Sequence, residues 1–142
     1  MISSSHFHPM LVHFPIAIIT VGFLFDLLTL AFKKETWLVK ASYWLEIIGM
    51  AGAVFAYGSG YFFTSPMEGE AGILREKHEL FATATLISIV IATLFRIVVT
   101  YLKKETTNLR YVSLLLFFIS VVLVSITGYL GGTLVIDYMI GL

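Results

Sequence analysis

The sequence predicts an all-α integral membrane protein, built as an up-down-up-down bundle of four helices. The chain has 142 residues, of which 58% are hydrophobic and 13% charged, whereas soluble domains average about 45–50% apolar and about 25% charged residues. The apolar residues gather in four runs, each close to the roughly 20 residues that a spanning helix needs. Short polar connections between the runs favour antiparallel neighbours in a bundle.

The four runs follow one another without a linker or an internal repeat, so a single transmembrane domain is expected over residues 1–142. The expected spans are 10–32, 37–63, 80–102 and 111–136. The first cations, Lys33 and Lys34, follow the first run, which is the reverse of a signal-peptide layout. The first run is therefore expected to be a retained span.

The cations of the loops predict an orientation. Lys33, Lys34, Lys103, Lys104 and Arg110 lie around the first and third loops. The middle loop, 64–79, holds fewer cations, and acids count for little in this rule. The first and third loops are therefore expected to face the cytoplasm. Both termini would then lie on the outer, periplasmic side of a bacterial inner membrane.

The composition also excludes several function classes. The chain has no cysteine, which excludes iron–sulfur clusters, thiolate zinc sites and covalent haem attachment within it. Its formal net charge is zero, so nothing suggests nucleic-acid binding. The lipid bilayer is the expected environment.

The four histidines are expected at the outer face. His6, His8 and His13 lead into the first helix, and His78 begins the third. Two helices of one bundle can hold imidazoles on opposite sides of a haem iron. We expect His13 and His78 to bind a haem b in this way, with His8 as the alternative ligand and Arg75 near the propionates. His6 is expected to be a bystander.

Two other interpretations of the histidines stay open. His6 and His8, with His13 or His78, could bind zinc or copper together with an acid. The acids available for that site are Glu79 and Asp137. The second interpretation gives the histidines only packing and partner contacts, as in a structural or assembly subunit without a cofactor.

Helical spacing predicts which faces point inward. On the third helix one stripe comprises His78, Ala82, Thr85, Ile89, Ala92 and Arg96, and on the second Glu46, Gly49, Ala53, Tyr57 and Gly60. The first helix has two candidate stripes, one with His8, Val12, Pro15, Ile19, Gly22 and Asp26, the other with His13, Ala17, Thr20 and Leu24. Spacing does not choose between them. Because His8 precedes a proline, we expect it in extended backbone just before the helix.

A second polar site is expected near the inner ends of the helices. Asp26, Glu46 and Arg96 lie at similar depths, and charges at such depths usually pair. The set is either a network that fixes helix packing or part of a proton path or quinone pocket. His78 and Arg96 are about 27 Å apart along their helix at about 1.5 Å per residue, so the two polar sites are expected to be separate.

Three segments together resemble a bacterial four-helix membrane family, domain of unknown function 2231. The opening His8-Pro-Met-Leu-Val-His13-Phe-Pro15 resembles that family's His-Pro-x-x-Val-His-Phe-Pro string. Lys77-His78-Glu79 resembles its third-helix histidine and Glu, and Gly131-Gly132-Thr-Leu134-Val135 its closing segment. Many members continue with a Tyr and a His-Gly pair, where this chain has Ile136-Asp137-Tyr138. A role of that family histidine would be absent here or taken by Asp137.

The resemblance implies an electron-transfer function. The family is similar in plan to small membrane b-type cytochromes, and such domains are often joined to c-type cytochrome modules. By this analogy the chain is expected to be an electron-transfer subunit and not a stand-alone enzyme. Its partners would be a quinone or other membrane donor and a c-type cytochrome or larger respiratory complex. Independently of the analogy, the glycine-rich faces of the second and fourth helices could serve a homodimer.

Overall fold

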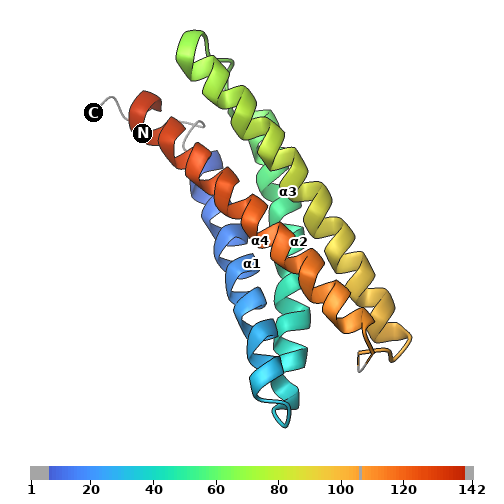
Figure 1. The fold of residues 1–142 in the computed structure, drawn as a ribbon. Helices are drawn as coiled ribbons and strands as arrows, with labels where there is room; N and C mark the ends of the chain where they lie inside the picture. The colour runs from blue at the N-terminus through green and yellow to red at the C-terminus, as the bar shows by residue number, and fades with distance from the viewer. Residues whose placement is uncertain (1–6, 106, 140–142) are drawn as a thin grey trace.

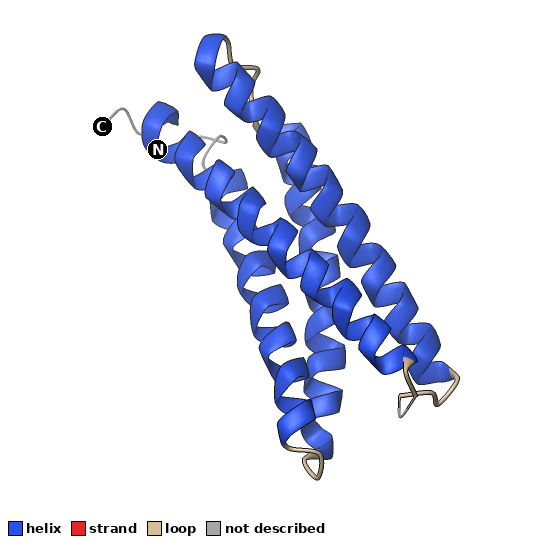
Figure 2. Cartoon of the chain, viewed as in Figure 1, coloured by secondary structure: helices blue, strands red, loops and turns tan. Residues whose placement is uncertain are grey.

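The computed structural model describes residues 7–105 and 107–139, which fold into four long helices (Figures 1 and 2). They are α1 (Phe7–Ala31), α2 (Thr36–Phe63), α3 (Gly69–Tyr101) and α4 (Leu109–Leu134), and α4 continues into a π-helical segment, η2 (Val135–Met139). All four helices are long and apolar enough to cross a membrane. The predicted all-α membrane bundle is confirmed.

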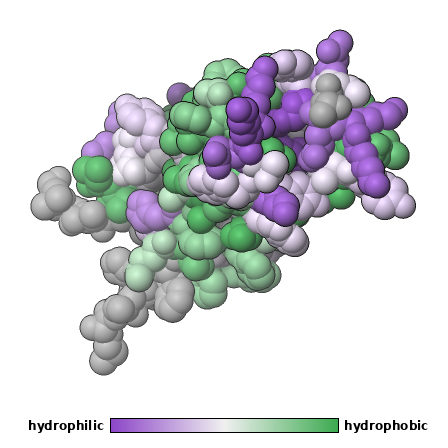
Figure 3. Space-filling model, turned by 90° about the horizontal axis from the view of Figure 1, so that it is seen from below, coloured by the Kyte–Doolittle hydropathy of each residue, from purple (hydrophilic) through white to green (hydrophobic). Residues whose placement is uncertain are grey.

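The helices run alternately up and down, so the loops lie at two ends of the bundle (Figure 1). Residues 32–35, between α1 and α2, and residues 102–105 and 107–108, between α3 and α4, lie at the same end, which we call the short-loop end. The start of α1, loop 64–68 and the end of α4 lie at the opposite end, which we call the termini end. Figure 3 looks onto the short-loop end and shows hydrophilic side chains gathered there. The exposed charged residues of the two loops are Lys33, Lys34, Glu35, Lys103 and Lys104.

Helix α3 begins eleven residues before its predicted span, at Gly69. The predicted loop 64–79 therefore shrinks to 64–68. The apolar window stops at the polar residues before position 80, but helix formation does not require an apolar sequence. Gly69 turns the chain with a φ of +62°, and Glu70 in the first turn complements the helix dipole. The 33-residue helix is about 50 Å long, which exceeds the roughly 30 Å hydrocarbon core.

The bundle consists of two hairpins, α1 with α2 and α3 with α4, each packed along its length. Within the second hairpin, hydroxyl pairs cross between helices: Ser88 with Ser120 at 2.8 Å and Thr85 with Thr127 at 2.9 Å. Such polar pairs hold helices together in lipid. The central core is apolar, and its buried residues are Ile19, Phe23, Ala53, Ile89, Phe117 and Val124.

The structure selects one of the two candidate stripes on α1. Pro15, Ile19 and Asp26 are buried, whereas His13 and Leu24 of the other stripe are exposed. The inward stripe is thus the one that contains His8. Spacing alone could not decide this, because α1 is apolar on every side and only its neighbours define an inside.

The outer faces of the helices are covered by exposed large apolar side chains, among them Phe14, Phe55, Phe62 and Leu80. Soluble monomers rarely expose contiguous apolar surface on this scale, so the surface suits contact with lipid. Tyr57 was predicted to point inward but is 37% exposed. Its hydroxyl lies 3.1 Å from Thr83 Oγ1, which draws the ring to the α2–α3 boundary.

Candidate functional site

The two histidines that meet across the bundle are His8 and His78. Their ring centroids are 6.3 Å apart and the ring planes stand at 73°. The prediction that His8 lies in extended backbone is wrong, because α1 already begins at Phe7. Pro9 fits the first turn, where a backbone N–H has no partner within the helix. His8 thus belongs to the helix that aims its ring at α3.

The hydrogen bonds of the His8 ring identify its protonated nitrogen. Nδ1 lies 2.8 Å from Ser59 Oγ, and the Ser59 hydroxyl donates to the carbonyl of Ala56 at 2.7 Å. A serine hydroxyl has one hydrogen, so Ser59 Oγ must accept from His8 Nδ1–H. In the neutral ring Nε2 then carries the lone pair, and no described residue donates a hydrogen bond to it.

The His78 ring is held in the same way from α4. Its Nδ1 lies 3.1 Å from the carbonyl oxygen of Thr127. A carbonyl only accepts, so Nδ1–H is the donor and Nε2 again keeps the lone pair. Within residues 7–105 and 107–139 this Nε2 has no hydrogen-bond partner either. Metal-bound histidines are usually oriented by such an Nδ1–H bond.

A glycine of the neighbouring helix supports each ring. A Cβ at Gly60 would lie 3.1 Å from His8 Cε1, and a Cβ at Gly131 would lie 3.0 Å from His78 Cε1. Both distances are tighter than ordinary van der Waals contact. The two hairpins therefore build equivalent halves of the site, each with a histidine on one helix and an acceptor and a glycine on the next.

The other predicted ligands lie apart from this pair. His13 is exposed on α1, and His6 lies outside the described residues. Arg75, one turn before His78 on α3, is half-buried and forms no ion pair or hydrogen bond with any described residue. No group of three or more His, Asp or Glu side chains in the described ranges is arranged to hold a metal ion. The predicted bare-metal sets with Glu79 or Asp137 are not assembled there.

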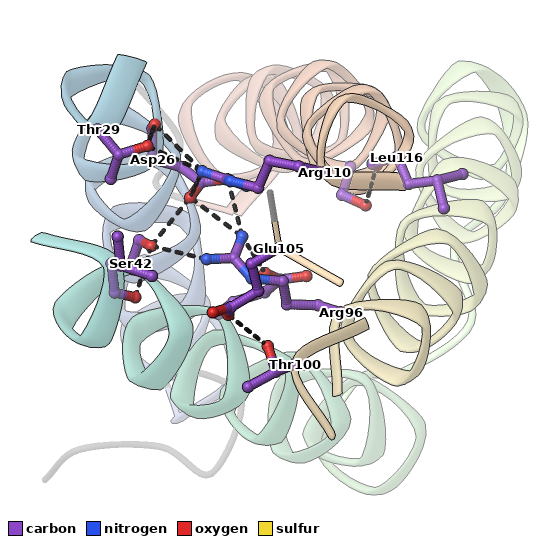
Figure 4. Close-up of polar contacts among 11 residues, drawn as sticks. Asp26, Thr29, Ser42, Arg96, Thr100, Glu105, Arg110 and Leu116 are labelled. Carbon is purple, nitrogen blue, oxygen red and sulfur yellow. Dashed lines mark hydrogen bonds and ion pairs between the residues drawn. The ribbon is translucent and has the colours of Figure 1, made fainter. Parts of the chain in front are cut away.

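The second polar site, which we call the arginine–carboxylate cluster, comprises Asp26, Ser42, Glu46, Arg96 and Arg110. Figure 4 shows Asp26, Ser42 and the two arginines pointing toward one another. Asp26 lies at its centre and is fully buried. Arg96 Nη1 donates to both of its carboxylate oxygens, at 3.0 and 2.9 Å. Ser42 donates to Oδ1 at 2.9 Å. The structure thus brings together Asp26, Glu46 and Arg96, which the sequence placed at similar depths in their helices.

Arg110 is the member of the cluster that sequence reasoning missed. Its position between two apolar runs suggested a loop cation, but it lies in the first turn of α4 with its residue only 8% exposed. Its guanidinium donates to both oxygens of Asp26 and, at 2.9 Å, to Thr29 Oγ1. The sequence held one indication of its burial, a charge imbalance. The two acids expected inside the bundle, Asp26 and Glu46, were matched by a single expected arginine, Arg96.

The same two helices define both sites. His8 and Asp26 are eighteen residues apart on α1, and His78 and Arg96 are eighteen residues apart on α3. Eighteen residues are about five helical turns, so each pair shares one face. The buried residues Ile19, Ile89 and Phe117 lie between the two levels. The two polar sites are separate, as the helix length predicted.

The comparisons with known proteins identify a family. Neither a curated protein nor a solved structure matches the chain. The family model described as "Predicted membrane protein (DUF2231)" matches residues 5–142. That range covers all four helices and both polar sites. The chain therefore belongs to the DUF2231 family of predicted membrane proteins.

Proposed function

We propose that this membrane protein binds one haem b through His8 and His78 and passes single electrons between a membrane donor, such as the quinone pool, and a partner at the termini end. The observation that carries the proposal is the pair of facing imidazoles. Each has its Nδ1–H engaged and its Nε2 without a partner among the described residues. His8 replaces His13, the ligand expected from the sequence.

The geometry of the pair supports a shared iron. Bonds from a metal ion to imidazole nitrogen are about 2 Å long, so two imidazoles on opposite sides of one ion would have ring centroids about 6 Å apart. The observed separation is 6.3 Å. Neutral histidine is a usual haem ligand, and a haem bound here would supply one-electron oxidation and reduction of its iron.

The surroundings of the pair also suit a haem. Gly60 and Gly131 leave room for each ring to lie flat against the neighbouring helix. Arg75 lies one turn from His78 and pairs with no described acid, and guanidinium groups bind carboxylates such as propionates in bidentate fashion. The cluster around Asp26, by contrast, offers no unpartnered imidazole.

The location of the pair decides which partners the proposal needs. The four loop lysines at the short-loop end favour the cytoplasm for that end, even though Arg110 is buried in an ion pair. The histidines then lie near the periplasmic face of a bacterial inner membrane. A haem near one face cannot carry electrons across the bilayer alone. A quinone or membrane subunit is therefore the donor, and a c-type cytochrome or larger respiratory complex the acceptor.

An absorption spectrum of the detergent-purified chain from haem-supplied cells tests the proposal. We expect a Soret band and sharpened visible bands on reduction. His8→Ala and His78→Ala should each abolish or shift these bands, whereas His13→Ala, the matched control on α1, should keep them. A colourless wild-type protein would reject haem binding. An equal loss in His13→Ala would reject the ligand assignment.

The same preparation separates the two alternatives. Metal without porphyrin in elemental analysis would indicate a histidine-based metal-ion protein. A protein with neither, which co-purifies in fixed ratio with a larger complex, would indicate a structural or assembly subunit. The number of histidines at the site favours the haem, because two imidazoles alone leave a bare ion short of ligands.

A further inference from the structure

Glu46 is a buried carboxyl group whose oxygens are not hydrogen-bonded. It lies on α2, one turn beyond Ser42, and is fully buried. Its Oε2 is 3.8 Å from Arg96 Nη1, too far for a hydrogen bond. In the described part of the chain neither Glu46 oxygen accepts a hydrogen bond. A buried ionised carboxylate in that position is costly.

The charges around Glu46 do not offset the cost of burying its ionised carboxylate. Asp26 on α1, Arg96 on α3 and Arg110 on α4 are the charged groups of the cluster, and both guanidiniums donate to Asp26. Ser42 donates to Asp26 as well. Asp26 is therefore the fully paired acid of the cluster, and Glu46 is left with a distant charge and no donor.

Three further buried polar groups at this level lack a partner. They are Thr93 Oγ1, Arg96 Nε and Ser113 Oγ, none of which bonds to another described residue. Thr93 is one turn from Arg96 on α3, and Ser113 is one turn from Arg110 on α4. Buried polar groups that protein does not satisfy are normally satisfied by internal water, which needs two to four polar partners. These groups and Glu46 supply both donors and acceptors.

Charged side chains lead from Glu46 toward the short-loop end of the bundle. Beyond Arg96 lie Ser42 and Asp26 and then Arg110, whose side chain is 10% exposed. Toward the termini end, Ile19, Ile89 and Phe117 are completely buried and apolar. The hydroxyls on that side, Ser88 with Ser120 and Thr85 with Thr127, are paired with each other. Water and protons therefore have a charged approach from the short-loop end, whereas the hydroxyls on the other side are already hydrogen-bonded.

We propose that Glu46 is a proton-binding site, hydrated by water held at Thr93, Ser113 and Arg96 Nε, and that it exchanges its proton with the aqueous phase at the short-loop end. The step is a transfer between internal water and the carboxyl group, and it needs no other reactant. This site is independent of haem binding at His8 and His78, so either proposal can fail alone.

Infrared spectroscopy of the full chain, with its glutamate carboxyl groups labelled with ¹³C, tests the site. Across a pH series we expect a carboxylic acid C=O band separate from the bands of exposed glutamates. The band should be absent in Glu46→Gln and unchanged in Glu76→Gln, an exposed acid on α3. Superimposable wild-type and Glu46→Gln spectra would overturn the proposal. If Glu46→Gln does not fold, absence of a separate band in the labelled wild type has the same meaning.

Two further measurements address the water and its side of entry. Transfer to D₂O should shift the Glu46 band, and Thr93→Val should move its frequency by removing one of the groups proposed to hold the water. In vesicles with one chain orientation, the band should respond to a pH change on the short-loop side. A band that ignores D₂O would overturn the hydration, and a response only from the termini side would overturn the route.

Discussion

The histidine pair and the arginine–carboxylate cluster are built by the same helices but use their polar groups differently. At the termini end each imidazole is held through one nitrogen, while the other nitrogen has no partner in the described ranges. At the other site, Asp26 receives hydrogen bonds from Arg96, Arg110 and Ser42. The two imidazoles are oriented and each still has a nitrogen that can bind a ligand, whereas the carboxylate of Asp26 is already fully hydrogen-bonded.

The difference shows how a small membrane bundle uses its polar residues. In hydrocarbon every polar group must find a partner. Asp26 finds its partners within the chain and so links α1 to α2, α3 and α4. The histidines are oriented by their neighbours, but each Nε2 has no hydrogen-bond partner among the described residues. A polar atom left without a partner in this way is expected at a ligand-binding site. Glu46 resembles the histidines more than it resembles Asp26, although it lies beside Asp26.

The largest effect is expected from Asp26→Ala. Removal of this carboxylate leaves two buried guanidiniums without their acceptor, which costs about 3–5 kcal/mol. We expect a large drop in the thermal unfolding midpoint in detergent, or loss of folded protein. Asp137→Ala, which changes an exposed aspartate of η2, is the matched control and should leave the midpoint unchanged. Equal unfolding midpoints for the two variants would mean that Asp26 does not hold the helices together.

A smaller effect is expected from Gly131→Val. The new side chain would place Cβ 3.0 Å from His78 Cε1, and overpacking of this kind costs about 1–3 kcal/mol. The haem content per chain, measured by absorbance, should fall together with the unfolding midpoint. Gly132→Val adds the same side chain where nothing lies within 4 Å, so it should behave as wild type. If both variants keep their full haem content, haem binding does not depend on the present position of the His78 ring.

Ser59→Ala should weaken ligand binding more than it weakens the fold. It removes the acceptor of His8 Nδ1–H, and loss of such a hydrogen bond costs about 1 kcal/mol. Loss of an orienting partner typically lowers metal affinity about 10–100-fold, which haem titration of the stripped protein can measure. Ser125→Ala, an exposed serine bonded to its own helix, is the control. An unchanged affinity in Ser59→Ala would show that the bond does not orient a ligand.

The smallest effect is expected from Tyr57→Phe. Its hydroxyl meets Thr83 at an exposed position between the two sites, so loss of the bond should cost about 0.5 kcal/mol or less. The unfolding midpoint of Tyr57→Phe should nearly match that of Tyr129→Phe, which changes a more exposed tyrosine. A drop as large as that of Gly131→Val would show that the α2–α3 contact matters as much as the histidine support.

Much of the fold was predictable because apolar run length is a local property. The four spans and the antiparallel order followed from it, and so did the inward stripe of α3, whose polar ends mark one face. The start of α3 was not predictable from hydropathy, since a helix can continue past the membrane in polar sequence. The burial of Arg110 was hidden for a similar reason, because position beside a loop does not reveal where a long side chain points.

The sequence by itself determined the class of protein, the number of spans, the absence of thiolate chemistry and the two levels of polar residues. Only the tertiary structure decided that His8 and not His13 faces His78, that both arginines bind Asp26, and that no described residue hydrogen-bonds to Glu46. The physical reason is that α1 and α2 are apolar on nearly every side. Which of their faces lies inside depends on the helices packed against them, and those contacts join residues far apart in the chain.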